Sequence, residues 1–180
     1  MAEKPALVAI GGEPATGKST VMREVIARLG ACEEFEFGLL RGTAYPDDEV
    51  FVLGRYEGAA FDGTDTLSMA VMPDAKEFLN AVTAERPRWT VLFEGDRLFS
   101  ESFFEHAIDL GFDISGFVLS VGEHELERRH RERADTQDET WLRGRQTKVR
   151  NVTERFEFEE ILNETEVERR YAVDRVFEAI

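Results

Sequence analysis

The chain has 180 residues, a net charge of −15 at pH 7 and 42% hydrophobic positions. Its apolar runs are far shorter than the roughly 20 residues of a membrane span, so we expect a single domain over 1–180, cytoplasmic and without a membrane partner. One cysteine, Cys32, excludes an internal disulfide, and three scattered histidines offer no zinc spacing. The negative charge argues against non-specific binding of polyanions by the whole surface.

The first segments of the chain have the order strand, glycine-rich loop, helix. Residues 6–10 suit a buried parallel strand, and 18–29 carry the apolar spacing of a helix that Gly30 ends. This order is the context that a phosphate-binding loop requires. The loop pattern itself is matched in full by Gly12, Glu13, Pro14, Ala15, Thr16, Gly17, Lys18 and Ser19.

This loop predicts a site for a nucleoside triphosphate, here ATP with Mg²⁺. Backbone N–H groups between Gly12 and Thr20 surround phosphate oxygens in such loops. Lys18 then reaches the β and γ phosphates, and the hydroxyl of Ser19 ligates magnesium. A chance match is improbable because the flanking strand and helix agree with the motif.

The rest of the chain alternates between strand and helix patterns. Residues 35–41 and 50–55 flank the turn-forming residues 44–49 and predict a hairpin or two short strands. Helices are expected at 73–82, 101–110, 123–133, 139–156 and 165–180, and strands at 89–93, 116–121 and 159–162. Alternation of this kind predicts an α/β fold of three layers, with a mostly parallel sheet and helices on both faces.

Acidic and basic residues follow the expected strand 89–93, where parallel sheets bind their ligands. Glu94 is a candidate magnesium ligand, and Asp96 is a candidate base for an attacking hydroxyl. The adjacent Arg97 can bind an anionic acceptor. The alternative is an ordinary polar strand end, with Ser100 capping the next helix.

Basic residues concentrate between Arg128 and Arg150, where eight arginines and lysines face four acids and the local charge is +4. Arg129 and Arg133 lie one helical turn apart and predict a lid over about 123–150 that stabilises the transferred phosphoryl group. The alternative is a solvated helix held by pairs such as Glu125 with Arg129.

The segment 53–69 is rich in glycine and hydroxyl groups and lies where a phosphate acceptor is expected. Arg41 and Arg55 are candidate contacts to a phosphate or a base, and Asp65 is a candidate hydrogen-bonding partner for base or sugar edges. Equally, Asp65 or Thr66 can cap a short helix.

In this order, the loop, the strand-end Asp-Arg pair and the arginine-bearing segment resemble the small P-loop nucleoside and nucleotide kinases over nearly the whole chain. Residues 96–100 are similar to the Asp-Arg-Tyr motif of thymidylate kinases, with Leu98 in place of the tyrosine. That resemblance implies an acceptor-side role for Asp96 and Arg97. The segment 53–69 resembles kinases of bacteriophage genomes, some of which phosphorylate 5-hydroxymethyluracil in DNA.

We therefore expect a phosphotransferase that uses ATP and Mg²⁺, with Lys18, Asp96, Arg129 and Arg133 as its catalytic residues. Its expected partner is a nucleotide-type acceptor, preferably 5-hydroxymethyluracil in phage DNA and alternatively a free deoxynucleoside or deoxynucleotide. An ATP-driven switch that hydrolyses ATP without an acceptor is the alternative of another class. The sequence does not fix the oligomeric state.

Overall fold

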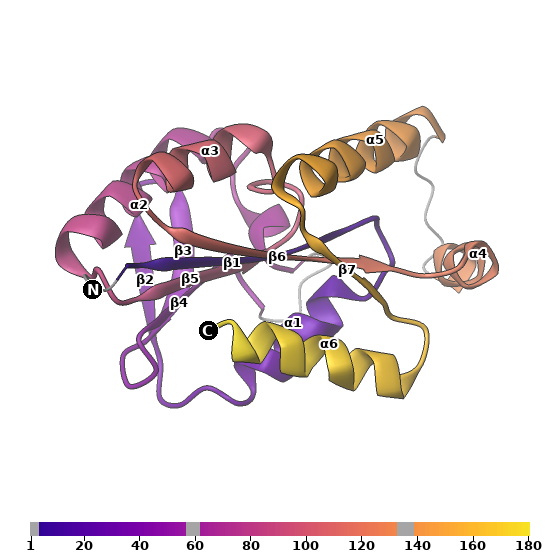
Figure 1. Ribbon diagram of the computed structural model, residues 1–180, viewed down its shortest axis with the longest axis horizontal. Helices are drawn as coiled ribbons and strands as arrows, with labels where there is room; N and C mark the ends of the chain where they lie inside the picture. Colours follow the sequence, from indigo (N-terminus) through magenta and orange to yellow (C-terminus); the bar gives the residue numbers. More distant parts are fainter. Residues whose placement is uncertain (1–3, 57–61, 133–138) are drawn as a thin grey trace.

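Within the described residues, 4–56, 62–132 and 139–180, seven strands form one sheet with helices on both faces (Figure 1). The strands of this computed structural model are β1 (Ala6–Gly12), β2 (Glu33–Phe37), β3 (Leu40–Tyr45), β4 (Val50–Leu53), β5 (Thr90–Glu94), β6 (Asp113–Ser120) and β7 (Glu159–Leu162). The helices are α1 (Lys18–Ile26), the 3-10 turn η1 (Thr64–Thr66), α2 (Met72–Glu85), α3 (Glu101–Asp109), α4 (Glu123–Glu132), α5 (Glu139–Phe156) and α6 (Glu166–Glu178).

The sheet has the strand order β2-β3-β4-β5-β1-β6-β7. From β4 to β7 all neighbours are parallel, and β2 and β3 add an antiparallel hairpin at one edge. Helices α1 and α6 pack together on one face, whereas α2, α3 and α5 lie on the other (Figure 1). The predicted α/β class with a mostly parallel sheet is confirmed. The carboxyl ends of β4, β5, β1 and β6 therefore meet at one edge, beside the loop that follows β1.

The antiparallel pairing of β3 with β4 confirms the predicted hairpin, but the boundaries 35–41 and 50–55 were wrong. Two strands, β2 and β3, occupy the first part, and Gly38 lies in the turn between them with a φ of 58°. Glycine adopts this left-handed conformation without strain, so the chain reverses inside the segment that the apolar pattern predicted to be one strand. Asp74 at the start of α2 accepts the N–H of Leu39 and holds the turn. Residues 44 and 45, which were predicted to lie in the turn, therefore belong to β3.

The other element boundaries agree with the sequence patterns to within a few residues. Helix α1 ends at Ile26 rather than at 29, and α2 continues to Glu85 rather than ending at 82. Helix α6 begins with a capping box, in which Thr165 accepts the N–H of Glu168 and the Glu168 carboxylate accepts the N–H of Thr165.

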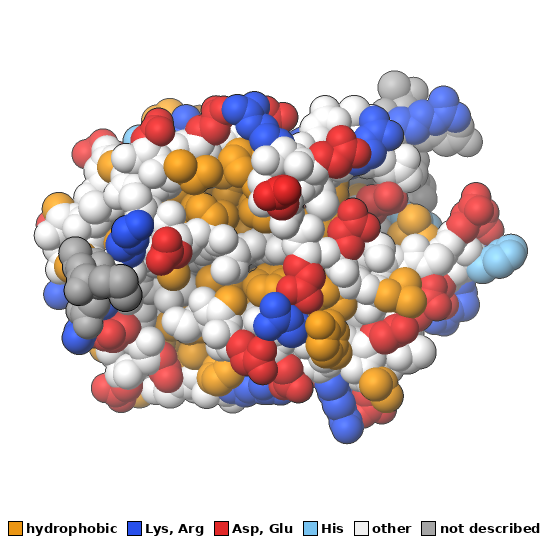
Figure 2. Space-filling model, viewed as in Figure 1, with side chains coloured by type: hydrophobic (Ala, Val, Ile, Leu, Met, Phe, Trp, Pro, Cys, Tyr) orange, Lys and Arg blue, Asp and Glu red, His pale blue; other side chains and the backbone are white. Residues whose placement is uncertain are grey.

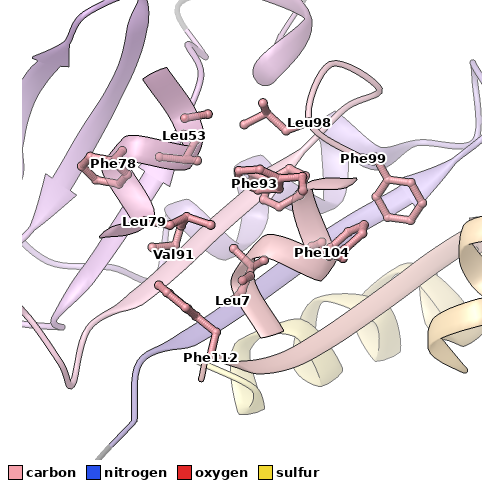
Figure 3. Close-up of a cluster of buried hydrophobic side chains, with 14 of the residues drawn as sticks. Leu7, Leu53, Phe78, Leu79, Val91, Phe93, Leu98, Phe99, Phe104 and Phe112 are labelled. Atoms are coloured by element: carbon pink, nitrogen blue, oxygen red, sulfur yellow. The ribbon is translucent and has the colours of Figure 1, made fainter. Parts of the chain in front are cut away.

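The core has two halves, one on each face of the sheet. Between the sheet and helices α2, α3 and α5, Phe93, Phe99 and Phe104 are almost fully buried (Figure 3). Phe104 lies at the centre of this half, with its ring centroid 5.3 Å from that of Phe99 and 5.0 Å from that of Phe158. This packing fixes the start of α3 against the end of β5 and so positions the connection from residue 95 to residue 100.

On the face shown in Figure 2, acidic and basic side chains are interspersed, and basic side chains gather at the end of the molecule formed by α5. Helix α5 carries Arg143, Arg145, Lys148, Arg150 and Arg155 in its sequence. In the described part of the chain, no helix is long and apolar enough to cross a membrane.

Candidate functional site

The loop between β1 and α1 folds around the side chain of Lys18. Its Nζ donates hydrogen bonds to the carbonyl oxygens of Gly12 at 2.9 Å and Glu13 at 2.8 Å. Gly12 and Gly17 have φ values of 137° and 91°, which favour glycine, and a Cβ at Gly12 would lie 2.5 Å from the carbonyl oxygen of Leu119. The loop therefore passes close to β6, and the ammonium group lies over its backbone.

Ser19, in the first turn of α1, contacts the last residue of β5. Its Oγ donates a 2.9 Å hydrogen bond to Oε1 of Glu94, whose residue surface is only 1% exposed. Since Ile10 of β1 is the register partner of Glu94, the carboxylate ends the strand directly beside the loop. The two predicted magnesium ligands, Ser19 and Glu94, are thus brought together.

Burial is the largest influence on Glu94 and raises the pKa of its carboxyl from 4.5 to about 7. The ammonium of Lys18 and the hydrogen bond from Ser19 act in the opposite direction, and the neighbouring carboxylates of Asp65 and Asp62 raise the pKa further. A cation bound at this position would favour the ionised form. The site is therefore electrostatically suited to a positive ion.

The segment after residue 62 packs closely against Glu94, so that position 63 has room only for a glycine. A Cβ built on Gly63 would lie 2.5 Å from Oε1 of Glu94, and Gly63 has a φ of 65°. The hydroxyl of Thr64 donates a 2.9 Å hydrogen bond to the Glu94 carbonyl oxygen. Residues 57–61 of the candidate acceptor segment lie outside the described residues.

Asp65 holds the turn that carries the Asp96-Arg97 pair. Its Oδ1 accepts the backbone N–H groups of Asp96 at 3.1 Å and of Arg97 at 3.2 Å. Burial is the main cause that raises the pKa of Asp65, and the nearby Asp96 adds to it. The residue chosen from the sequence as an acceptor contact is therefore placed at the site, where it shapes the turn through backbone hydrogen bonds.

Two residues of α5 reach the same turn, and the sequence did not single them out. Arg145 pairs with the carboxylate of Asp96 at 3.1 Å, and Lys148 donates a 2.7 Å hydrogen bond to the Asp96 carbonyl oxygen. The only signal for them was the local excess of positive charge between 143 and 150.

Arg129 of α4 joins the phosphate-binding loop to the end of β7. Its Nη1 donates to the carbonyl oxygen of Ala15 at 3.3 Å, and its Nη2 donates to that of Asn163 at 2.9 Å. Its Nε bonds to Glu125, so the predicted ion pair within the helix also exists. Arg133, the other predicted lid arginine, lies outside the described residues.

The buried Asn163 is a second residue that sequence reasoning missed. Its Nδ2 donates a 2.7 Å hydrogen bond to the carbonyl oxygen of Thr16, which fixes the loop from the β7 side. Together with Gly17, Thr20 and Arg129 it lines a cavity of about 290 Å³ beside the loop. No local pattern identifies an asparagine 147 residues away as part of this loop's surroundings.

Arg41 and Arg55 lie farther along the sheet. Arg41 pairs with Glu36 at 2.7 Å, within the hairpin, and Arg55 is exposed. Both line a small cavity of about 50 Å³ beside β3 and β4. That cavity does not include Glu94 or Asp96. The backbone of Arg55 nevertheless pairs with Gly63, the residue that packs against Glu94, so Arg55 lies near the end of β5, whereas Arg41 stays within the hairpin.

Comparison with known proteins gives a family and a fold. The model of the family P-loop Nucleotide Kinase3 matches residues 4–169. A gluconokinase from Sinorhizobium meliloti 1021 is similar in structure, with a TM-score of 0.50, 14% identity and coverage of 98% of this chain and 95% of that chain. A sugar kinase from Janibacter sp. HTCC2649 has a TM-score of 0.45 and 11% identity, with coverage of 97% and 91%. A search of curated proteins finds no match.

Proposed function

This chain belongs to the P-loop Nucleotide Kinase3 family and is a phosphotransferase, and we propose that it transfers the γ-phosphate of ATP to a hydroxyl group of a nucleotide-type acceptor. The observation that carries this proposal is the contact of the Ser19 hydroxyl with the Glu94 carboxylate, beside the loop that contains Lys18. It combines an oxygen pair suited to Mg²⁺ with a cation suited to phosphate.

The residues present fit a magnesium ion. A hydroxyl and a carboxylate are hard oxygen ligands of the kind that Mg²⁺ prefers, and they are 2.9 Å apart. Bound magnesium neutralises charge on the phosphate oxygens during transfer. Ser19 and Glu94 would hold it, while Lys18 leaves its carbonyl contacts to bind phosphate oxygens.

On the acceptor side, we assign the base to Asp96. It follows β5 by two residues, so it is near the loop, and its carboxylate is held by Arg145. A carboxylate in this place accepts the proton of the attacking hydroxyl, while Arg97 binds the acceptor. Arg129 closes over ATP from the side opposite Lys18, and Arg133 is proposed for the same lid from the sequence alone.

The favoured acceptor is the 5-hydroxymethyl group of 5-hydroxymethyluracil in phage DNA, and its support is the resemblance of segment 53–69 to phage kinases. A free thymidine-type nucleotide is the alternative within the same chemistry. The likeness to the gluconokinase supports the fold alone. An ATPase without an acceptor is the alternative from another class. The basic residues around Asp96 favour a reaction with an acceptor.

The test is transfer of labelled γ-phosphate from ATP with magnesium. Duplex DNA containing 5-hydroxymethyluracil, unmodified DNA and free thymidine-type nucleotides are offered in parallel. Label in the modified DNA alone identifies a kinase of the DNA base, and label in a nucleotide identifies a nucleotide kinase. Equal phosphate release with and without every acceptor contradicts the proposal and favours the ATPase.

A further inference from the structure

Lys148 places a positive charge inside the acceptor side of the site. Its side chain is partly buried, and its Nζ donates a 2.7 Å hydrogen bond to the backbone carbonyl oxygen of Asp96. Burial is the main cause that lowers the pKa of this ammonium, opposed by the charge of Asp96. A carbonyl satisfies one of three N–H donors and compensates the buried charge only in part.

Arg97 is a second cation of this kind, and it lies close enough to Lys148 to lower the pKa of the ammonium. The Nε of Arg97 is buried and has no hydrogen-bond partner among the described residues. Its Nη2 lies 3.5 Å from the carbonyl oxygen of Asp65, which is a weak contact. One guanidinium group, of Arg97, and one ammonium group, of Lys148, therefore face this turn. The hydrogen-bond acceptors that the structure gives them are carbonyl oxygens.

The carboxylates near these cations are already engaged. Oδ1 of Asp65 accepts two backbone N–H groups, and Asp96 is paired with Arg145. Three cations and two carboxylates thus meet at this turn: Arg97, Arg145 and Lys148 with Asp65 and Asp96. The turn therefore carries positive charge, although the net charge of the chain is −15. The excess charge is local and has the sign that attracts an anion.

Lys148 also lines a hollow large enough for part of a small molecule. This cavity of about 500 Å³ lies between the start of α3 and the side of α5, and Ser100, Ser102, Thr147 and Asn151 share its lining. The Oγ of Ser100 is buried and has no hydrogen-bond partner among the described residues. The cation therefore lies between the Asp96 turn and a cavity wall of hydroxyl and amide groups. Glu101, which also lines this cavity, is paired with Arg155.

We propose that Lys148 and Arg97 bind a fixed oxyanion of the acceptor, a phosphate ester or a carboxylate, and that Lys148 determines the preference for charged acceptors. This inference rests on the proposed function, because it describes the acceptor of the same reaction. It assigns to α5 a role in acceptor choice besides any role in closing over ATP. It also predicts that neutral nucleosides and neutral sugars are poor acceptors.

Binding of matched acceptors tests the proposal without requiring turnover. The dissociation constants of 5-hydroxymethyl-2′-deoxyuridine, its 5′-monophosphate, the sugar alcohol glucitol and gluconate are measured by calorimetry in the presence of magnesium and a non-hydrolysable ATP analogue. We expect at least one anionic compound to bind at least tenfold more tightly than its neutral partner. The phosphate pair and the carboxylate pair show which oxyanion the site takes.

Variants connect this preference to Lys148. Lys148→Met should remove most of the difference between anionic and neutral partners, with Arg97 supplying what remains, and Lys148→Arg should restore most of it. Arg150→Met, which removes an exposed cation from the same helix, should leave the difference unchanged. Thermal unfolding of each variant shows that it is folded.

The proposal is overturned if the wild-type protein binds charged and neutral partners equally or binds neither anionic compound. It is also overturned if Lys148→Met keeps the full preference. Transfer of labelled phosphate to the same four compounds is scored separately. A preference in binding, without label transfer to any of these compounds or to the DNA and nucleotide acceptors named above, would contradict the proposed function and leave the oxyanion site established.

Discussion

The hydroxyl of Ser19 donates a 2.9 Å hydrogen bond to the carboxylate of Glu94, although 75 residues separate them in the chain. The contact exists because β1 and β5 are parallel neighbours, so that the loop after β1 and the last residue of β5 share one edge of the sheet. Two oxygen ligands of the kind that magnesium prefers therefore meet at the phosphate-binding loop.

Replacing Ser19 by alanine should raise the magnesium concentration that gives half-maximal activity and lower kcat by about tenfold or more, as expected when a charged transition state loses support. The reason is that one proposed ligand oxygen is removed while the loop backbone stays in place. The measurement is a magnesium titration of phosphate transfer. Ser115→Ala, near the amino end of β6 and away from the strand ends that form the site, is the control. An unchanged titration of Ser19→Ala would remove Ser19 from the metal site.

Replacing Asp96 by asparagine should lower the transfer rate by about 10² or more, because an amide does not accept the proton of the attacking hydroxyl. ATP affinity should stay nearly the same, since the described contacts of Asp96 are with α5 and with Asp65. Single-turnover transfer and ATP binding are compared with those of Asp109→Asn, an exposed residue of α3. A wild-type rate in Asp96→Asn would show that another group is the base.

The sequence was sufficient for the parts of the site that are contiguous in the chain. The glycines and Lys18 identify the loop by their spacing, and Glu94 and Asp96 stand directly after a strand pattern that predicts their place at the sheet edge. These residues were predictable because backbone geometry alone brings strand ends together. The α/β order followed from the same patterns.

Residues that reach the site from distant elements were not predictable in this way. Lys148 and Arg145 depend on how α5 packs across the Asp96 turn, and Asn163 depends on the end of β7 meeting the loop. The spacing of residues along a helix predicts which side chains share a face of that helix. It does not predict which other segment of the protein that face contacts. The hairpin at Gly38 was missed for a related reason, because a single left-handed glycine within an apolar run reverses the chain.

The pKa of Glu94 predicts how stability depends on pH in the absence of magnesium and ATP. Its carboxyl has a pKa of about 7 in the folded protein and 4.5 as its ordinary value. Between these values the folded state binds more protons than the unfolded state, so the free energy of unfolding falls as pH rises. The loss is complete above about pH 7, and a shift of this size corresponds to roughly 3 kcal/mol.

Glu94→Gln should remove this dependence. The variant should therefore gain thermal stability relative to the wild-type protein at pH 8, and gain little at pH 5, when unfolding is followed with a chelator present. Glu160→Gln, which changes an exposed glutamate, controls for the loss of one negative charge. The same gain at both pH values, or no gain at pH 8, would show that the buried carboxyl does not determine the trend.

Arg129 and Arg128 are adjacent in α4 but have different surroundings, and this makes them a matched pair. Arg129 donates to the carbonyl oxygens of Ala15 and Asn163 and lines the cavity beside the loop, whereas Arg128 bonds to Glu125 and Glu132. If Arg129 closes over ATP, Arg129→Met should weaken ATP binding by about tenfold or more, the size expected for a lost charged hydrogen bond.

Arg128→Met should leave ATP affinity unchanged, because its exposed ion pairs lie within the helix and contribute little. Equilibrium binding of ATP and kcat are measured for both variants. A drop in kcat for Arg129→Met at wild-type ATP affinity would restrict Arg129 to the transition state, since only interactions made there change the rate alone. Wild-type values of both ATP affinity and kcat would show that Arg129 does not bind the nucleotide. The contacts of Arg129 with the loop would then be purely structural.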